Sequence, residues 1–152
     1  MSVTYFNDLT NAMFHQDVIV PQSISSDSTG TGVDCAVIGS NLINGRVSLG
    51  AVSSLTSLAV TFQASADNST GWVSCTQPDG TTATVTLTAA NTDGMIAFQL
   101  PRAASETASP YRYVRASWDI TGTSALTCAS IFGLIQMPNA DDGFVAAPPV
   151  IN

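Results

Sequence analysis

Side chains able to perform acid–base or nucleophilic chemistry are scarce in this sequence. His15 is the single histidine, Glu106 is the single glutamate, and lysine does not occur. A Ser-His-Asp triad would have to use His15, which lies near the N-terminus, and no G-x-S-x-G turn is present to expose a serine nucleophile. We interpret His15 as a surface or packed residue and Glu106 as a solvated loop residue. The sequence therefore predicts no catalytic residues, and we expect that the protein is not an enzyme.

Aspartates are more numerous, but they fall where turns are expected. Four lie at the ends of expected strands: Asp67, Asp79, Asp93 and Asp119. Paired carboxylates there would suit glycoside hydrolysis, but aspartate beside glycine or asparagine is the usual residue of a turn. Oxygens of residues 67–69 or 141–142 would suit calcium, yet neither a D-x-D-x-D-G loop nor a glycine-rich phosphate loop occurs. We therefore predict no metal site and no cofactor.

The cysteines Cys35, Cys75 and Cys128 are odd in number and far apart. No C-x-x-C spacing occurs, and a single histidine does not complete a zinc site. The N-terminus lacks the basic and apolar regions of a secretory signal, so we expect that the protein is made in the cytoplasm. In that compartment the cysteines are expected to be free, mostly buried thiols.

Charge is low throughout the chain. Hydrophobic residues make up 45% of the 152 residues, which predicts a folded domain, and the net charge is -7. Charged residues account for only 10%. All positive charge comes from four dispersed arginines: Arg46, Arg102, Arg112 and Arg115. Because so few cations cannot neutralise a run of phosphates, we expect neither nucleic acid nor an anionic membrane surface as a partner.

The middle of the chain alternates apolar and polar residues with the period of a β-strand. The clearest run is residues 58–66, and residues 82–89 and 111–119 follow the same rule. Asn44-Gly45 and Asp93-Gly94 are typical of tight turns between strands. Eight strands at this spacing predict an all-β fold, an eight-stranded antiparallel jelly-roll β-sandwich, with an immunoglobulin-like sandwich as the alternative.

The chain divides into three expected parts. Residues 1–32 form an N-terminal arm and linker, residues 33–137 form the jelly-roll β-sandwich, and residues 138–152 form an extended C-terminal tail. Four apolar residues of the arm follow helical spacing and predict a short helix: Phe6, Leu9, Met13 and Phe14. Since the strands are expected to begin near Val33, a chain without residues 1–20 is expected to keep a folded body.

Aromatic residues of the expected sandwich allow two interpretations. The residues concerned are Trp72, Tyr111, Tyr113 and Trp118. On an exposed face they would stack against sugars. In the favoured interpretation Trp118 packs in the core with Val114, and Tyr111 and Tyr113 lie on the opposite face, at an interface. A sandwich with this little charge cannot protect its faces and edges with charged side chains, so association with other chains is expected.

Two stretches resemble small head proteins of tailed bacteriophages. One is FNDLTNAMFHQDVIVPQSISSDSTGTGVD, residues 6–34, and the other is LAVTFQASADNSTGW, residues 58–72. In the second stretch a strand ends at Ser65-Ala66-Asp67 and an aromatic strand begins at Trp72. The family resembled is the capsid decoration, or cement, proteins with a jelly-roll body.

The resemblance implies a structural protein of the virion, made in the host cytoplasm and bound to the capsid surface. Its expected partner is the major capsid protein, and its expected form is a homo-oligomer, a trimer. The predicted interface residues are Phe6, Leu9, Met13, Phe14, Tyr111, Tyr113 and Phe144. The alternatives are a glycan-binding head of a fibre or spike, and a structural subunit of the tail or neck.

Overall fold

The protein is all-β and antiparallel in a computed structural model that describes residues 13–35, 43–50, 55–101, 109–121 and 131–138. Those residues contain no helix. Their strands are β1 (Met13–Gln22), β2 (Ser28–Thr29), β3 (Val33–Asp34), β4 (Ile43–Leu49), β5 (Ser57–Ser65), β6 (Val73–Ser74), β7 (Thr84–Leu87), β8 (Asp93–Phe98), β9 (Tyr113–Thr121) and β10 (Ile131–Pro138). The expected all-β class is therefore confirmed.

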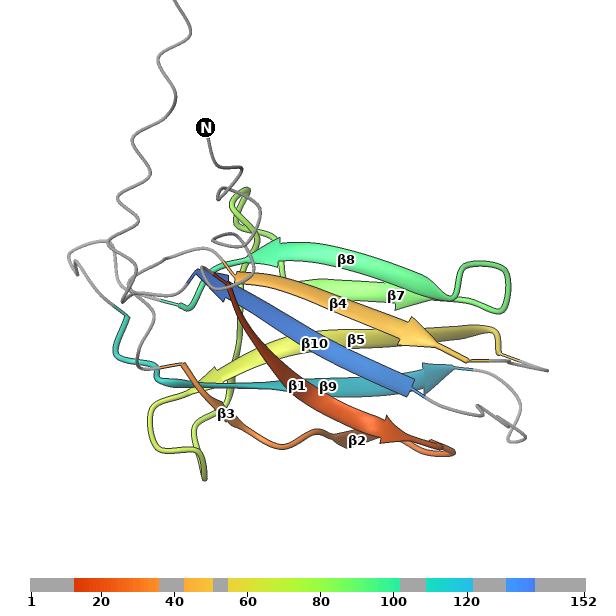
Figure 1. Ribbon diagram of the computed structural model, residues 1–152, viewed down its shortest axis with the longest axis horizontal. Helices are drawn as coiled ribbons and strands as arrows, with labels where there is room; N and C mark the ends of the chain where they lie inside the picture. Colours follow the sequence, from red (N-terminus) through yellow and green to blue (C-terminus); the bar gives the residue numbers. More distant parts are fainter. Residues whose placement is uncertain (1–12, 36–42, 51–54, 102–108, 122–130, 139–152) are drawn as a thin grey trace, which may run out of the picture.

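The strands form two sheets. The front sheet has the order β1-β10-β4-β8, and Figure 1 shows it lying across the second, back sheet. The back sheet has the order β2-β9-β5-β6, with β3 also beside β9 and β7 also beside β5. Because β5 and β9 pair along their whole lengths, β2 and β3 share the free edge of β9, and β6 and β7 share the free edge of β5. Each sheet therefore has four strand positions.

The core lies between the two sheets and is built by alternation. In β5, Leu58, Val60 and Phe62 are fully buried, whereas the residues between them are partly exposed. Phe62 stacks on Phe98 of β8, with ring centroids 4.7 Å apart. In β9, Trp118 is buried as predicted, and its indole Nε1 donates a hydrogen bond of 3.1 Å to the Ser26 carbonyl. The period-two pattern thus identified β5 and β9 and their buried faces correctly.

Two residue pairs that were expected in turns belong to strands instead. Asn44-Gly45 lies in β4, and Asp93-Gly94 lies in β8, which pairs with β4. A Cβ atom on Gly45 would lie 2.4 Å from Phe62 Cζ, and one on Gly94 would lie 2.4 Å from Val85 Cγ1. These glycines let the front sheet approach large side chains of the back sheet. The turn prediction was wrong because Asn-Gly and Asp-Gly also occur in strands, where a side chain packed against the glycine leaves no room for a Cβ atom.

Gly45→Ala is expected to lower the free energy of unfolding by about 1–3 kcal/mol, because its methyl group overpacks the core against the Phe62 ring. Urea unfolding measures this. Phe62→Leu removes the ring atoms that the methyl group meets, so Gly45→Ala should cost less in a Phe62→Leu background than in the native one. Equal costs in the two backgrounds would show that contact between the added methyl group and the Phe62 ring is not the cause of the destabilisation.

Other turns form where the sequence predicts them. Asn68 and Gly71 both have positive φ, 63° and 61°, in the turn after β5. The Pro78-Asp79-Gly80 turn places Gly80 at φ 86°, and the Asp79 carboxylate accepts the Thr81 amide at 2.9 Å. The left-handed backbone conformation is the reason that glycine and asparagine occur here.

The segment before Val33 belongs to the sandwich rather than lying outside it. β1 pairs with β10 and forms one edge of the front sheet, and Val18 and Ile19 are each only 1% exposed. Met13 and Phe14 begin this strand, so the helix expected across them does not include them. The remaining residues of that predicted helix lie outside the described part of the chain. Helical spacing of a few apolar residues did not outweigh the pairing offered by β10.

Candidate functional site

The outer surface of the back sheet combines aromatic, cationic and anionic side chains. Alternation points every second residue of β5 and β9 away from the core. The resulting surface, here called the back-sheet face, consists of Ser57, Ala59, Thr61 and Gln63 of β5 and Tyr113, Arg115, Ser117, Asp119 and Thr121 of β9. It is polar and mostly uncharged, with one cation and one anion on β9.

Arg115 is held in place at one end of the back-sheet face. Its guanidinium carbon lies 4.2 Å from the centre of the Trp72 ring, and its Nε donates a 3.0 Å hydrogen bond to Gln63 Oε1. Partial desolvation lowers the pKa of Arg115, which nevertheless stays cationic at neutral pH. Stacking and hydrogen bonding together restrict a side chain that would otherwise sample many rotamers.

Trp72 is positioned by the turn that follows β5. The Asp67 carboxylate accepts the amides of Ser69 and Thr70, both at 2.9 Å. These bonds hold the pKa of Asp67 well below its usual range, so the turn is ordered by an ionised carboxylate. Both oxygens of Asp67 are engaged in the turn, since Thr70 Oγ1 donates to the second one. Asp67 thus organises this turn, which is the role that the sequence predicts for an aspartate at a strand end.

Gly32 brings the beginning of β3 against the same turn. A Cβ atom at Gly32 would lie 1.7 Å from Asn68 Oδ1 and 2.9 Å from Trp72 Cη2. The Trp72 ring thus has the Gly32 backbone near its Cη2 atom and the Arg115 guanidinium over one face. This arrangement leaves less of the aromatic surface open than the sequence suggests.

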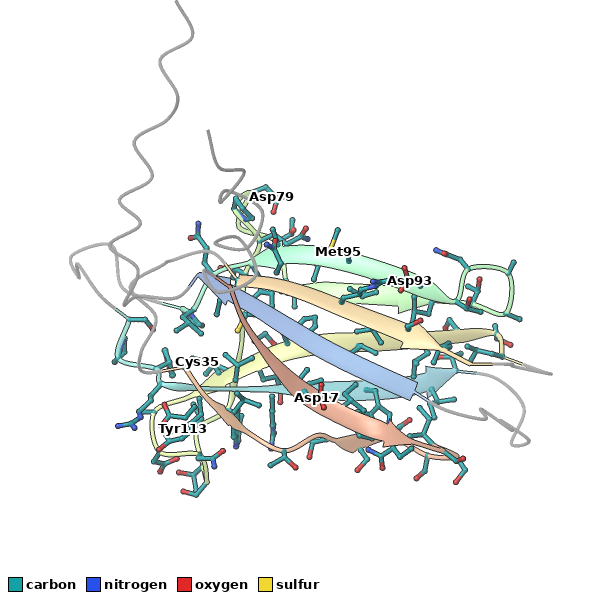
Figure 2. The ribbon with its side chains drawn as sticks, viewed as in Figure 1. Asp17, Cys35, Asp79, Asp93, Met95 and Tyr113 are labelled. Carbon is teal, nitrogen blue, oxygen red and sulfur yellow. The ribbon has the colours of Figure 1, made fainter. Side chains whose placement is uncertain are left out.

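The other described arginines are paired with carboxylates. Arg46 donates two hydrogen bonds of 3.1 Å to Asp93 on the outer surface of the front sheet, where Figure 2 labels Asp93. Arg112 makes a bidentate pair with Asp34 and lies 5.6 Å from the centre of the Tyr113 ring. Hydrogen bonds from Arg46 lower the pKa of Asp93. Arg115 differs because its contacts are with an aromatic ring and an amide.

Negative charge lies at the opposite end of the back-sheet face. Asp119 is exposed in β9, four residues after Arg115, and none of the described residues forms a hydrogen bond or ion pair with its carboxylate. Asp27, which precedes β2, accepts the Ile120 amide at 2.8 Å through Oδ1. The face is therefore bipolar along β9, positive toward Arg115 and negative toward Asp119.

The predicted interface residues fall into three groups. Tyr113 lies on the back-sheet face, but Tyr111 is partly buried against the core. Met13 and Phe14 lie in β1, opposite Pro138 and Met137 of β10. Phe6, Leu9 and Phe144 lie outside the described residues. Their role at an interface stays a prediction.

Arg115 and Asp119 were missed as functional candidates. The alternation that places Trp118 in the core also places Arg115 and Asp119 on one outward face, so the signal was present in the sequence. The contact between Arg115 and Trp72 has no such signal, because the residues come from different parts of the chain.

Two cysteines pack in the core as expected. Cys35 is 3% exposed and Cys75 is fully buried, and both are free thiols. Burial raises the pKa of each to about 12, so both stay protonated. Cys128, Glu106 and Asp141-Asp142 lie outside the described residues, and His15 lies in β1.

Within the described ranges, no three histidine, cysteine, aspartate or glutamate side chains gather closely enough to hold a metal ion. The same ranges include no helix with the length and apolar character needed to cross a membrane.

The strand order defines this protein as an antiparallel β-sandwich of two sheets. No family model matches the chain, and no curated protein matches it. Among solved structures, the fold is similar to that of the SPBc2 prophage-derived protein YomS, with a TM-score of 0.50 and 14% sequence identity. The match covers 82% of this chain and 91% of that protein. At this identity the likeness concerns the fold.

Proposed function

We propose that the chain is a structural protein of a bacteriophage virion that binds the outside of the assembled head and stabilises the shell, without enzymatic activity. The observation that carries the proposal is the sandwich fold, shared with a prophage-derived protein. The sequence resemblance to capsid decoration proteins supports the finer assignment.

The strand order supports a jelly roll. Numbered by position along the chain, with β2 and β3 as one position and β6 and β7 as another, the front sheet runs 1-8-3-6 and the back sheet runs 2-7-4-5. Each sheet therefore pairs positions from opposite halves of the chain, and all but one connection passes from one sheet to the other. Two interlocked Greek keys produce such an order.

The outer surfaces of the sheets support a role in assembly. Short uncharged side chains lie among the few charged ones on both surfaces, for example Ser48 and Ala97 in front and Ala59 and Thr61 behind. Charged residues are the usual protection of a solitary sandwich against association. Their scarcity suits a protein that covers its surfaces with other chains.

Stabilisation of the head would follow from mass action. A protein that binds the assembled shell, and not its separated subunits, makes disassembly costlier by RT ln(1 + [L]/Kd). The major capsid protein is the proposed partner, and the chain is proposed to act as a homo-oligomer. The resemblance implies three copies, and the mass in solution tests that number.

Particles that lack this chain are expected to lose resistance to heat or osmotic shock, and adding the purified chain back should restore it. The measurement is the surviving fraction of particles after each treatment. Labelled chain should appear on the head surface in electron micrographs. Equal robustness with and without the chain would contradict the role in stabilisation, and labelling of the tail or neck would assign it to another part of the virion.

The glycan-binding alternative rests on Trp72 and Tyr113. It is less favoured because the Arg115 guanidinium covers one face of the Trp72 ring, whereas sugar stacking needs an open aromatic face. Trp72→Ala is accordingly expected to leave phage adsorption to cells unchanged.

A further inference from the structure

We infer that two copies of this chain associate through their back-sheet faces, with Arg115 of each copy opposite Asp119 of the other. The inference concerns self-association, does not rest on the proposed role at the phage head, and puts a two-fold dimer in place of the trimer that the resemblance implies. It rests on the two charges of the face, on their spacing, and on the small side chains between them.

The cation is held ready for a carboxylate. Arg46 and Arg112 already have carboxylates, Asp93 and Asp34 respectively. Among the described residues, Arg115 has only the Trp72 ring as a stacking partner and only Gln63 as a hydrogen-bond partner, and that hydrogen bond uses Nε. Its two terminal nitrogens therefore keep donors for an incoming carboxylate, and the stacked geometry reduces the entropy lost on binding.

The anion is available on the same face. Asp119 is exposed, and no ion pair within the described ranges neutralises it. Asp27 adds negative charge at that end of the face, since its own bond is to the Ile120 amide. A surface with a positive and a negative end is complementary to a second copy turned end for end.

The spacing suits a two-fold axis. Residues 115 and 119 are four apart on one strand, which separates their Cα atoms by roughly 13 Å. A two-fold axis that lies in the contact plane, perpendicular to β9, and passes over Ser117 brings each Arg115 opposite the Asp119 of the other copy. The same operation forms the pair twice, as a two-fold contact requires.

The surface between the charges allows close approach. Ser117 of β9 lies beside Thr61 of β5, and Asp119 lies beside Ala59. Thr61 and Thr84 hydroxyls bond to each other at 2.8 Å, so these polar groups are satisfied within the sheet. Small side chains let two sheets face each other at the usual distance of about 10 Å. Trp72 and Tyr113 at the margin are residue types that dominate interface energies.

A charge-reversal cycle on the full chain tests the contact. Sedimentation over a range of concentrations should show a dimer of the 15.7 kDa chain. Arg115→Asp and Asp119→Arg should each raise the dimer dissociation constant by about tenfold or more, because each places like charges opposite one another. The double variant again has opposite charges and should recover most of the affinity.

Asp17→Arg is the matched control, since Asp17 is exposed in β1 of the other sheet, where Figure 2 labels it. It makes the same charge change as Asp119→Arg and should leave the dissociation constant unchanged. Far-ultraviolet circular dichroism confirms that each variant is folded. Asp119→Asn and Arg115→Gln each remove a charge without reversing it, so they are expected to weaken the dimer less than the reversals.

Several outcomes would overturn the inference. They are a monomer or a trimer at all concentrations, a dimer that Asp119→Arg leaves intact, or a folded double variant that stays as weak as the single ones. Equal weakening by Asp17→Arg would show that the loss is not specific to the back-sheet face, and would overturn the inference. Higher salt should reduce the affinity advantage of the native dimer over the Asp119→Asn dimer, because the variant lacks the ion pairs that salt screens.

Discussion

A chain that begins at residue 23 is expected not to fold into the native sandwich. The deletion removes all of β1, which pairs with β10 and buries Val18 and Ile19 at 1% exposure each. Burial of two such aliphatic side chains contributes roughly 3–6 kcal/mol, before the lost pairing with β10 is counted. Natural domains have a net stability of only about 5–15 kcal/mol, so this loss, added to the lost pairing with β10, takes a large share of it.

Thermal unfolding followed by circular dichroism measures the effect. The control is a chain that begins at residue 13 and keeps β1 complete, which should unfold cooperatively near the temperature of the full chain. A cooperative transition at that same temperature for the chain that begins at residue 23 would contradict the assignment of β1 to the sandwich. The expectation that a chain without residues 1–20 keeps a folded body is replaced by this one, because Val18 and Ile19 lie in the core.

Phe62→Ala is expected to lower the free energy of unfolding by about 3–5 kcal/mol. Phe62 is fully buried at the centre of β5 and stacks on Phe98 at an interplanar angle of 16°. Its ring also fills the space beside Gly45 of β4, a residue with no side chain of its own to fill that space. Removing the ring therefore leaves a cavity bounded by both sheets.

Urea unfolding with an unchanged slope of free energy against denaturant measures this loss. Phe62→Leu should cost less, because it retains part of the volume. Thr86→Ala, at an exposed position of β7, should stay within about 0.5 kcal/mol of the native protein. A Phe62→Ala variant that loses less than about 1 kcal/mol would mean that the sheets close over the cavity.

The buried faces of β5 and β9 were predictable because strand alternation is a local property. A residue in an extended backbone has its side chain opposite to that of its neighbours, so Val60 and Val114 could be assigned to the core without knowing their partners. The turn at Asn68 and Gly71 was predictable for a similar reason, since left-handed backbone conformations select these residue types.

The errors occurred where a distant segment decided the local structure. Gly45 and Gly94 were assigned to turns, but each makes room for a side chain of the opposite sheet. Met13 and Phe14 were assigned to a helix, but β10 lies more than 100 residues later in the chain and offers them a strand partner. Neither neighbour could be identified from a short sequence window.

The back-sheet face likewise combines features that the sequence determines with features that only the tertiary structure decides. Sequence alternation alone determined that Tyr113, Arg115 and Asp119 share the outward side of one strand, and it determined the all-β class. Only the tertiary structure decided that Trp72 stacks on Arg115 and that the Asp67 turn holds it there. The physical reason is that alternation follows from the backbone of a single strand, whereas a stacked cation requires segments that chain folding alone brings together.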